Sequence, residues 1–319
     1  MTVLVTGGSG LVGSHVIVAL RAAGRPVRAL VRAPSRDKVV ALGAEPAVGD
    51  VTDEGLWRQA AAGVRGIVHA AALVMQRAPY REYERVNVGG TRLAAAAARA
   101  AGAPLVHLSS VAVYGGTTAY QPTPERRDED YPFRTVAPSD RYARTKRAAE
   151  ELVRAAAADG RLAAVALRPN VIYGERDRLF TPRLIAALGL RWTPAVGPGT
   201  NHLACVYAGN VAAAVVAALD AAQPGFRAYN VTNDRPPALT ERAFVAAFGA
   251  ALGKRVRRVR IPWLALRAVL TVARGPRLGR AAVSFLTGEN PYVSDRIRHE
   301  LGWEPPYSTL EAVQRSVAG

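Results

Sequence analysis

The sequence predicts an α/β fold, with a doubly wound parallel sheet followed by a smaller, mixed α/β C-terminal domain. Short apolar β-branched runs alternate with alanine-rich helical stretches through the first half of the chain. This alternation is typical of right-handed βαβ units, whose helices cover both faces of a parallel sheet. A glycine-rich turn directly follows the first apolar run, as in sheets that bind a ligand at their carboxyl edge.

Six strands are expected, at residues 2–6, 26–31, 45–49, 65–70, 104–109 and 162–168. Helices are expected at residues 11–23, 53–62, 82–101 and 139–158. The pattern loosens after Gly174, where prolines interrupt shorter elements. We therefore expect a Rossmann-type dinucleotide-binding domain over residues 1–174, to which 203–232 return, and a substrate-binding domain over 175–202 and 233–319.

Composition sets limits on the class of protein. The 319 residues are 50% hydrophobic, which suffices for a sizeable core. Cys205 is the single cysteine, so no internal disulfide can form and a reducing, cytoplasmic location is expected. A first strand beginning at residue 2 leaves no room for a signal peptide. No metal-ligating set is evident, so no metal is expected.

The formal net charge is +17. Only Lys38, Lys146 and Lys254 are lysines, and the abundant arginines occur in a chain also rich in alanine and glycine, which indicates compositional bias. No nucleic-acid motif with interleaved aromatic residues is present, so no nucleic-acid partner is expected. The basic stretch 254–280 surrounds an apolar run too short to span a bilayer. It predicts either a lid over an apolar pocket, which we favour, or a weak peripheral membrane contact.

The glycine-rich turn predicts a dinucleotide diphosphate site. Gly7, Gly10 and Gly13 are spaced three residues apart, so the turn can be tight, the ligand can approach the backbone, and the helix can pack on the sheet. Backbone N–H groups and the positive helix end would hold the diphosphate. The cofactor contacts expected here are Gly7, Ser9, Gly10, Leu11, Val12 and Gly13.

The end of the second strand indicates which nicotinamide cofactor is bound. NAD-specific sites place an acid there, whereas this chain has Arg32, Ser35 and Arg36. Two guanidinium groups and a hydroxyl suit a 2′-phosphate, so NADP(H) is favoured and NAD(H) is the alternative. A second interpretation is that Arg32 only stacks on the adenine.

Tyr142 and Lys146 stand four residues apart, and therefore on one face of a helix. Either this pair or the glycine turn alone is weak evidence for a function. The two together, in this order along the chain, are much stronger evidence. The chain resembles the extended short-chain dehydrogenase/reductase family over essentially its whole length. The motifs that carry the resemblance, beyond these two, are Gly49–Val51, His69–Ala72, Val86–Thr91, Leu108–Gly115 and Leu301–Pro305.

The resemblance implies further roles. The additional cofactor contacts would be Asp50, Val51, Ala70, Ala71, Ala72, Asn87, Tyr142, Lys146, Pro169 and Val171. Tyr142 would be the acid–base catalyst, its pKa lowered by the positive charges of Lys146 and of the oxidised nicotinamide, and Lys146 would also hold the nicotinamide ribose. Ser110 would donate to the substrate oxygen. Asn87 would hold the active-site helix and a proton-relay water. The alternative is that Asn87 only caps a helix or makes a buried hydrogen bond. Ser109 is expected to have a structural role.

Two positions indicate the branch of the family. Sugar-nucleotide enzymes carry an asparagine and an arginine for the substrate diphosphate where this chain has Val171 and Leu203. The resemblance is therefore to the 3β-hydroxysteroid dehydrogenase and ketoreductase branch, which implies an apolar ketone or alcohol as substrate. A nucleotide-sugar epimerase or dehydratase is the alternative, with His202 as a substitute phosphate donor, and a non-catalytic cofactor-sensing protein is a minor one. The family also implies a homodimer through the helices of Asn87 and Tyr142, where the small residues of 94–98 would permit close contact.

Overall fold

The computed structural model describes residues 1–74, 78–115, 125–190, 192–262, 264–265, 268 and 285–318. A seven-stranded sheet has the order β10-β6-β5-β4-β1-β2-β3, and all its neighbouring strands are parallel. Its strands are β1 (Val3–Thr6), β2 (Val27–Val31), β3 (Glu45–Val48), β4 (Gly66–His69), β5 (Leu105–Leu108), β6 (Ala163–Pro169) and β10 (Gly225–Val231). The predicted fold class is confirmed. The seventh strand, β10, is one that the apolar pattern does not single out.

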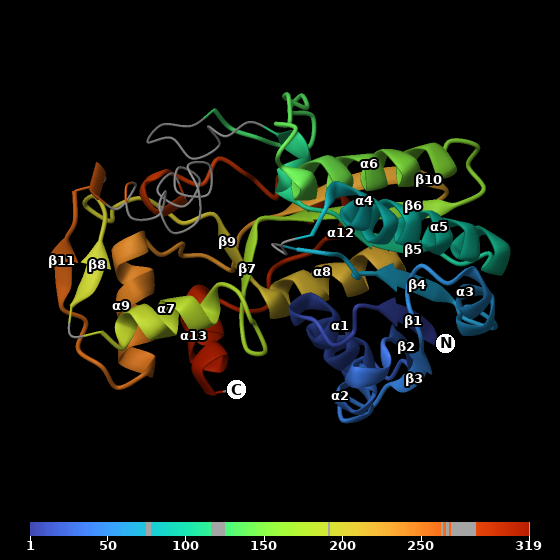
Figure 1. Cartoon of the computed structure of the whole chain (residues 1–319), viewed down its shortest axis with the longest axis horizontal. Helices are drawn as coiled ribbons and strands as arrows, with labels where there is room; N and C mark the ends of the chain where they lie inside the picture. Colours follow the sequence, from blue (N-terminus) through green and yellow to red (C-terminus); the bar gives the residue numbers. More distant parts are fainter. Residues whose placement is uncertain are drawn as a thin grey trace.

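Helices cover both faces of this sheet (Figure 1). One face packs against α1 (Leu11–Ala22) and α8 (Ala208–Asp220), through side chains such as Ile17 and Val215. The other face packs against α3 (Glu54–Ala60), α5 (Gly90–Ala101) and α6 (Arg141–Ala156). The other α-helices with bounds in the described part of the chain are α2 (Arg36–Val40), α4 (Tyr80–Tyr83), α7 (Thr181–Leu188), α9 (Glu241–Ala251), α12 (Asp295–Leu301) and α13 (Thr309–Ala318).

Three of the alanines of α5 face the interior of the chain. Ala94, Ala95 and Ala98 are at most 2% exposed and belong to the apolar core beneath α5 and α6. They allow α5 to approach its own sheet closely. The expectation that this run provides a dimer contact is therefore wrong for these three residues, because they are already buried within one chain.

A second group of elements lies beside the main sheet, on the left in Figure 1. Two small sheets pair β7 (Val171–Tyr173) with β9 (Cys205–Tyr207), and β8 (Thr193–Ala195) with β11 (Arg258–Arg260). An apolar cluster that includes Tyr173, Tyr207 and Phe244 holds this region together. Most of the predicted lid or membrane segment after residue 262 lies outside the described residues. None of the helices in the described ranges is long and apolar enough to cross a bilayer.

Candidate active site

The predicted site residues lie along one edge of the main sheet. Since β1, β4, β5 and β6 are parallel neighbours, their carboxyl ends meet at the same edge. The segments that leave this edge are the glycine turn, Ala70–Ala72, Ser109–Ser110 and Asn170–Val171. Residues more than 160 positions apart in the sequence are thereby brought together.

The glycine turn accepts no larger residue at two of its positions. Gly7 has a φ of 68°, and a Cβ there would lie 2.8 Å from the backbone nitrogen of Ala71. A Cβ on Gly13 would lie 2.2 Å from the carbonyl oxygen of Gly7. A Cβ on Gly10, at the N-cap of α1, would meet only that same carbonyl, at 3.2 Å. The turn therefore packs tightly on the protein at Gly7 and Gly13 and is open above Gly10. This opening suits a diphosphate bound to the free N–H groups of Leu11 and Val12.

The end of this edge where the sequence predicts the adenosine to bind, hereafter the adenosine end, is rich in exposed positive charge. Arg32 is exposed directly after β2. Burial raises the pKa of the nearby Asp50, but hydrogen bonds from Thr52 to its carboxylate, at 3.0 and 2.7 Å, and then the charges of Arg85 and Arg32 lower that pKa overall. Arg36 pairs with its neighbour Asp37 at 3.0 Å. Arg32 has no hydrogen bond or ion pair within the described structure, so its guanidinium is available to a ligand.

Ser110 and Tyr142 meet at the centre of the edge. Asp140 caps α6 by accepting a hydrogen bond from the backbone nitrogen of Ala143 at 3.0 Å, which places Tyr142 in the first turn. Burial raises the pKa of Tyr142 to about 12, although a hydrogen bond with Ser110 lowers it in part. In the chain alone, the loss of solvation outweighs the favourable contacts. The lowering of this pKa by Lys146 together with the oxidised nicotinamide stays a prediction.

Lys146 lies one turn along α6 and is 4% exposed. Its Nζ donates a hydrogen bond to the carbonyl oxygen of Leu108, at the end of β5. Burial lowers the pKa of Lys146 to about 8, while the negative charge of Glu150 opposes this shift. The ammonium is therefore fixed at the sheet edge rather than free in solvent.

Asn87 joins two parts of the site. Its Nδ2 donates to the hydroxyl of Thr145 on α6 at 3.1 Å, and its Oδ1 accepts from the backbone nitrogen of Leu73 at 2.7 Å. It stands in a short π-helical segment, Glu84–Gly89, which aims its side chain inward. Asn87 therefore connects α6 with the segment after β4. Of the roles predicted for Asn87, the structure displays the buried side-chain hydrogen bond.

A buried ion pair supports Lys146, and the sequence interpretation did not include it. Glu150, four residues after Lys146, is held by Arg168 of β6 at 2.5 Å, and both are 1% exposed. Ser109 also donates to Glu150 at 2.5 Å, so it has a structural partner. The spacing of Lys146 and Glu150 is the one sequence signal that could have pointed to this group.

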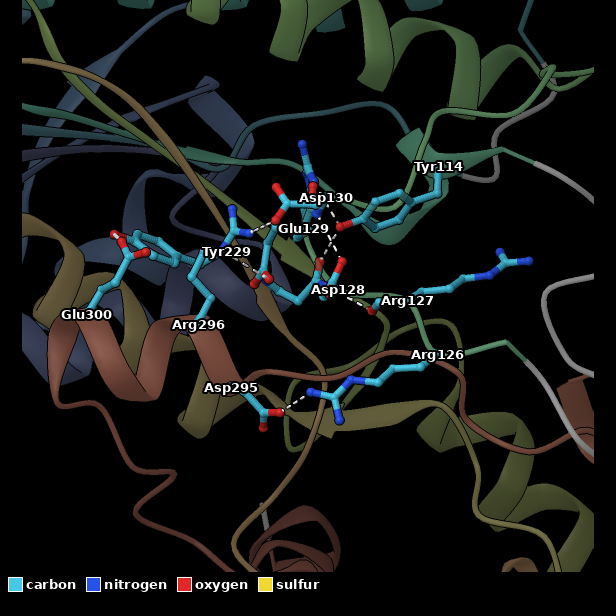
Figure 2. A network of polar contacts seen from close by, with 12 residues as sticks. Tyr114, Arg126, Arg127, Asp128, Glu129, Asp130, Tyr229, Asp295, Arg296 and Glu300 are labelled. Carbon is cyan, nitrogen blue, oxygen red and sulfur yellow. Dashed lines mark hydrogen bonds and ion pairs between the residues drawn. The ribbon is translucent and has the colours of Figure 1, made fainter.

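Polar contacts continue from this ion pair to the C-terminal part of the chain, and Figure 2 shows the portion of this network around Tyr114, Glu129 and Arg296. Arg168 Nη1 donates to the hydroxyl of Tyr114 at 2.8 Å, and that hydroxyl donates to Asn230 Oδ1 at 2.8 Å. The backbone nitrogen of Asn230 donates to Glu129 at 2.7 Å, and Glu129 lies 3.6 Å from Arg296 on α12. A continuous series of polar contacts therefore connects α6 with α12.

Leu203, one of the two positions that distinguish the branches, and His202, the alternative phosphate donor, are both engaged within the chain. Leu203 is 8% exposed and packs in the cluster of Tyr173 and Phe244. His202 donates its backbone N–H to Glu289 at 3.1 Å, and its Nδ1 lies 2.8 Å from the same carboxylate. A carboxylate at this distance opposes a diphosphate at His202.

Comparisons with known proteins agree with this arrangement. Residues 3–232 match the NAD dependent epimerase/dehydratase family. The chain therefore belongs to that family. It is 35% identical to the 4-hydroxy-2-methyl-3-oxo-4-farnesyl-3,4-dihydroquinoline-1-oxide ketoreductase of Stigmatella aurantiaca, over 95% of this chain and 92% of that protein. It is 31% identical to a 3 beta-hydroxysteroid dehydrogenase/Delta 5-->4-isomerase of Mycobacterium tuberculosis, over 98% of this chain and 88% of that protein.

A solved structure similar to the whole chain is that of MoeE5 in complex with UDP-glucose and NAD. The TM-score is 0.74 at 25% identity, with 100% of this chain and 98% of that chain covered. The predicted resemblance to the extended short-chain dehydrogenases/reductases is confirmed, and the protein is an NAD(P)-dependent oxidoreductase of that family. No group of acidic, histidine and cysteine side chains in the described ranges could hold a metal ion.

Proposed function

We propose that this protein is an NADP(H)-dependent reductase that converts a ketone on a largely apolar substrate into a secondary alcohol, and also runs in reverse. The observation that carries this proposal is the hydrogen-bonded pair of Ser110 and Tyr142, with buried Lys146 one turn further on α6. All three stand on the sheet edge that carries the glycine turn.

Each of these residues has a separate role in the proposed reduction. When bound, a reduced nicotinamide would supply the hydride that the carbonyl carbon takes up, so the carbonyl oxygen would need a proton. Tyr142, whose pKa is raised to about 12 by burial, keeps its proton at neutral pH and is suited to give it. Ser110 donates to the same oxygen as negative charge develops there. Lys146, with a pKa of about 8, is largely charged at neutral pH and stabilises the phenolate left behind.

An apolar substrate is supported by the side chains of the second region. Val171 and Leu203 offer no donor for a diphosphate, and His202 is paired with Glu289. The two relatives described above have a farnesyl group or a steroid in their names. A steroid-like or 3-keto acyl-like compound is therefore the substrate class we propose.

NADP(H) is the cofactor we propose, because Arg32 is exposed and unpaired where an NAD-specific site would place an acid. We also propose a cytoplasmic homodimer, as the family resemblance implies. Its contact would have to use outward-facing residues of α5 and α6, since three of the alanines of α5 are buried in the core.

Calorimetry on the NADPH-loaded protein tests the substrate class. A steroid or long-chain 3-keto compound should bind with a negative heat capacity change, as apolar burial requires, and should be reduced with NADPH consumption. UDP-glucose should not bind. Micromolar binding of UDP-glucose that is lost in His202→Ala would contradict the proposal and favour the epimerase alternative.

A further inference from the structure

Arg176 has an unusual backbone conformation close to the cofactor site. It follows β7, two residues after Gly174, and its φ of 67° is the only positive value outside glycine among the described residues. Residues other than glycine avoid this region, because the Cβ atom crowds the carbonyl oxygen. Such a conformation persists only where surrounding contacts fix it, so the contacts of Arg176 define what it does.

The side chain of Arg176 returns to the first helix of the sheet domain. Its Nε donates to the hydroxyl of Ser14 at 2.9 Å, and Ser14 in turn donates to the carbonyl oxygen of Leu11 at 2.9 Å. Helix side chains lean toward the N-terminus, so Ser14 projects back over the turn that begins at Leu11. The guanidinium is thereby anchored beside the turn whose free N–H groups follow Gly10.

A neighbouring carboxylate fixes the orientation of this guanidinium. Arg176 Nη2 lies 3.6 Å from Glu175, which also lies 2.9 Å from His15 Nε2 and accepts from the Tyr207 hydroxyl at 2.9 Å. Burial raises the pKa of Glu175, but His15, a backbone hydrogen bond and the Tyr207 hydroxyl together outweigh this effect and lower the pKa to about 2. The carboxylate is therefore ionised at neutral pH, and its charge is shared among three partners.

One part of the guanidinium is left without a partner. Nε is used by Ser14 and Nη2 faces Glu175, whereas Nη1 has no hydrogen bond or ion pair within the described part of the chain. The Arg176 side chain is 38% exposed, so a ligand can reach it. A planar guanidinium with free N–H groups matches the oxygen atoms of a phosphate.

We propose that Arg176 binds the diphosphate of the nicotinamide cofactor together with the glycine turn. The arginine comes from the chain segment that leaves β7, and it thereby adds a charged contact to the N–H groups at the start of α1. The inference rests on the proposed function only in requiring a nicotinamide cofactor at the glycine turn. It does not depend on the 2′-phosphate, the substrate or the catalytic role of Tyr142.

Calorimetric dissociation constants for four probes test this inference: NADPH, NADH, ADP-ribose and adenosine 2′-phosphate. The first three contain the diphosphate and the fourth does not. Arg176→Ala should weaken the first three by about tenfold or more, the effect expected for hydrogen bonds to a charged group, and leave adenosine 2′-phosphate unchanged. Arg32→Ala should show a different pattern, weakening only NADPH and adenosine 2′-phosphate. Failure of the diphosphate contact and failure of the NADP(H) preference are therefore distinguishable.

Two further variants separate ligand binding from folding. Arg176→Gly removes the side chain and also relieves the backbone crowding, so it should weaken the same three probes without lowering the melting temperature. Arg178→Ala removes an exposed arginine two residues further on and should change no dissociation constant. Unchanged ADP-ribose affinity in Arg176→Gly would overturn the proposal and leave Arg176 as a contact between parts of the fold. Equal weakening of all four probes would overturn it too, since that pattern indicates general disruption.

Discussion

The catalytic end and the adenosine end of the same sheet edge are built in different ways. Next to the buried Lys146, Glu150 and Arg168 form an ion pair in which both side chains are only 1% exposed. Around Arg32 the charges are exposed, and Arg36 pairs only with the exposed Asp37. Under the proposed function, proton transfer would take place where side chains are fixed and solvent is scarce, whereas the choice of cofactor would depend on arginines at the surface.

This difference has energetic consequences. Charges interact strongly in the buried group because little solvent screens them, and losing one partner leaves the other uncompensated. Exposed charges are screened by salt and contribute less to folding. Substitutions at the catalytic end should therefore change stability and pH dependence, and those at the adenosine end should change cofactor affinity alone.

The largest expected effect is on stability. Glu150→Gln should lower the free energy of unfolding by about 3–5 kcal/mol, because Arg168 would be left buried without its carboxylate. Denaturant unfolding measures this loss. The matched control is Glu151→Gln, an exposed neighbour that should change stability little. A loss no larger than that of the control would mean that the buried ion pair does not support α6.

The adenosine end should respond in binding and not in stability. Arg32→Ala should weaken NADPH by about 1.5–3 kcal/mol, the value for hydrogen bonds to a charged group, and leave NADH and the melting temperature unchanged. Fluorescence titration at two salt concentrations measures this, and the NADPH affinity of the unaltered protein should fall as salt rises. Lys38→Ala, an exposed lysine on α2, serves as the control. Equal weakening of NADH would show that Arg32 contacts the shared adenosine.

The pH dependence should separate the two ends further. Burial lowers the pKa of Lys146 to about 8, so kcat/KM for ketone reduction should fall as pH rises through that value and the ammonium loses its proton. The lowered pKa of Lys146 also affects stability. Between about pH 8 and the pKa of this lysine in the unfolded chain, the unfolded state binds more protons than the folded state, so the free energy of unfolding should rise with pH.

A variant of the neighbouring carboxylate checks this assignment. Glu150→Gln removes the negative charge that raises the Lys146 pKa, and should move the falling limb of the profile to lower pH. A limb that stays in place would show that another group controls it. Arg32→Ala should leave the limb unchanged.

The comparison also explains which features could be predicted from the sequence. The glycine turn, the sheet class and the catalytic helix depend on local patterns, such as glycine spacing and the alternation of strands with helices. Glu150 and Arg168 become partners only when α6 packs on β6, and no local pattern records that contact. The extent to which burial raises the pKa of Tyr142 in the chain alone also depends on tertiary packing. The left-handed backbone at Arg176 likewise has no sequence signal.

The central claim is that Tyr142 supplies the proton when a ketone is reduced. Single-turnover reduction of an apolar ketone by the NADPH-bound protein tests it most directly, with Tyr142→Phe compared against the unaltered chain. The account predicts that NADPH binds equally well to both, while the rate of hydride transfer falls by about 10² or more in the variant. A near-normal rate in Tyr142→Phe would contradict the account.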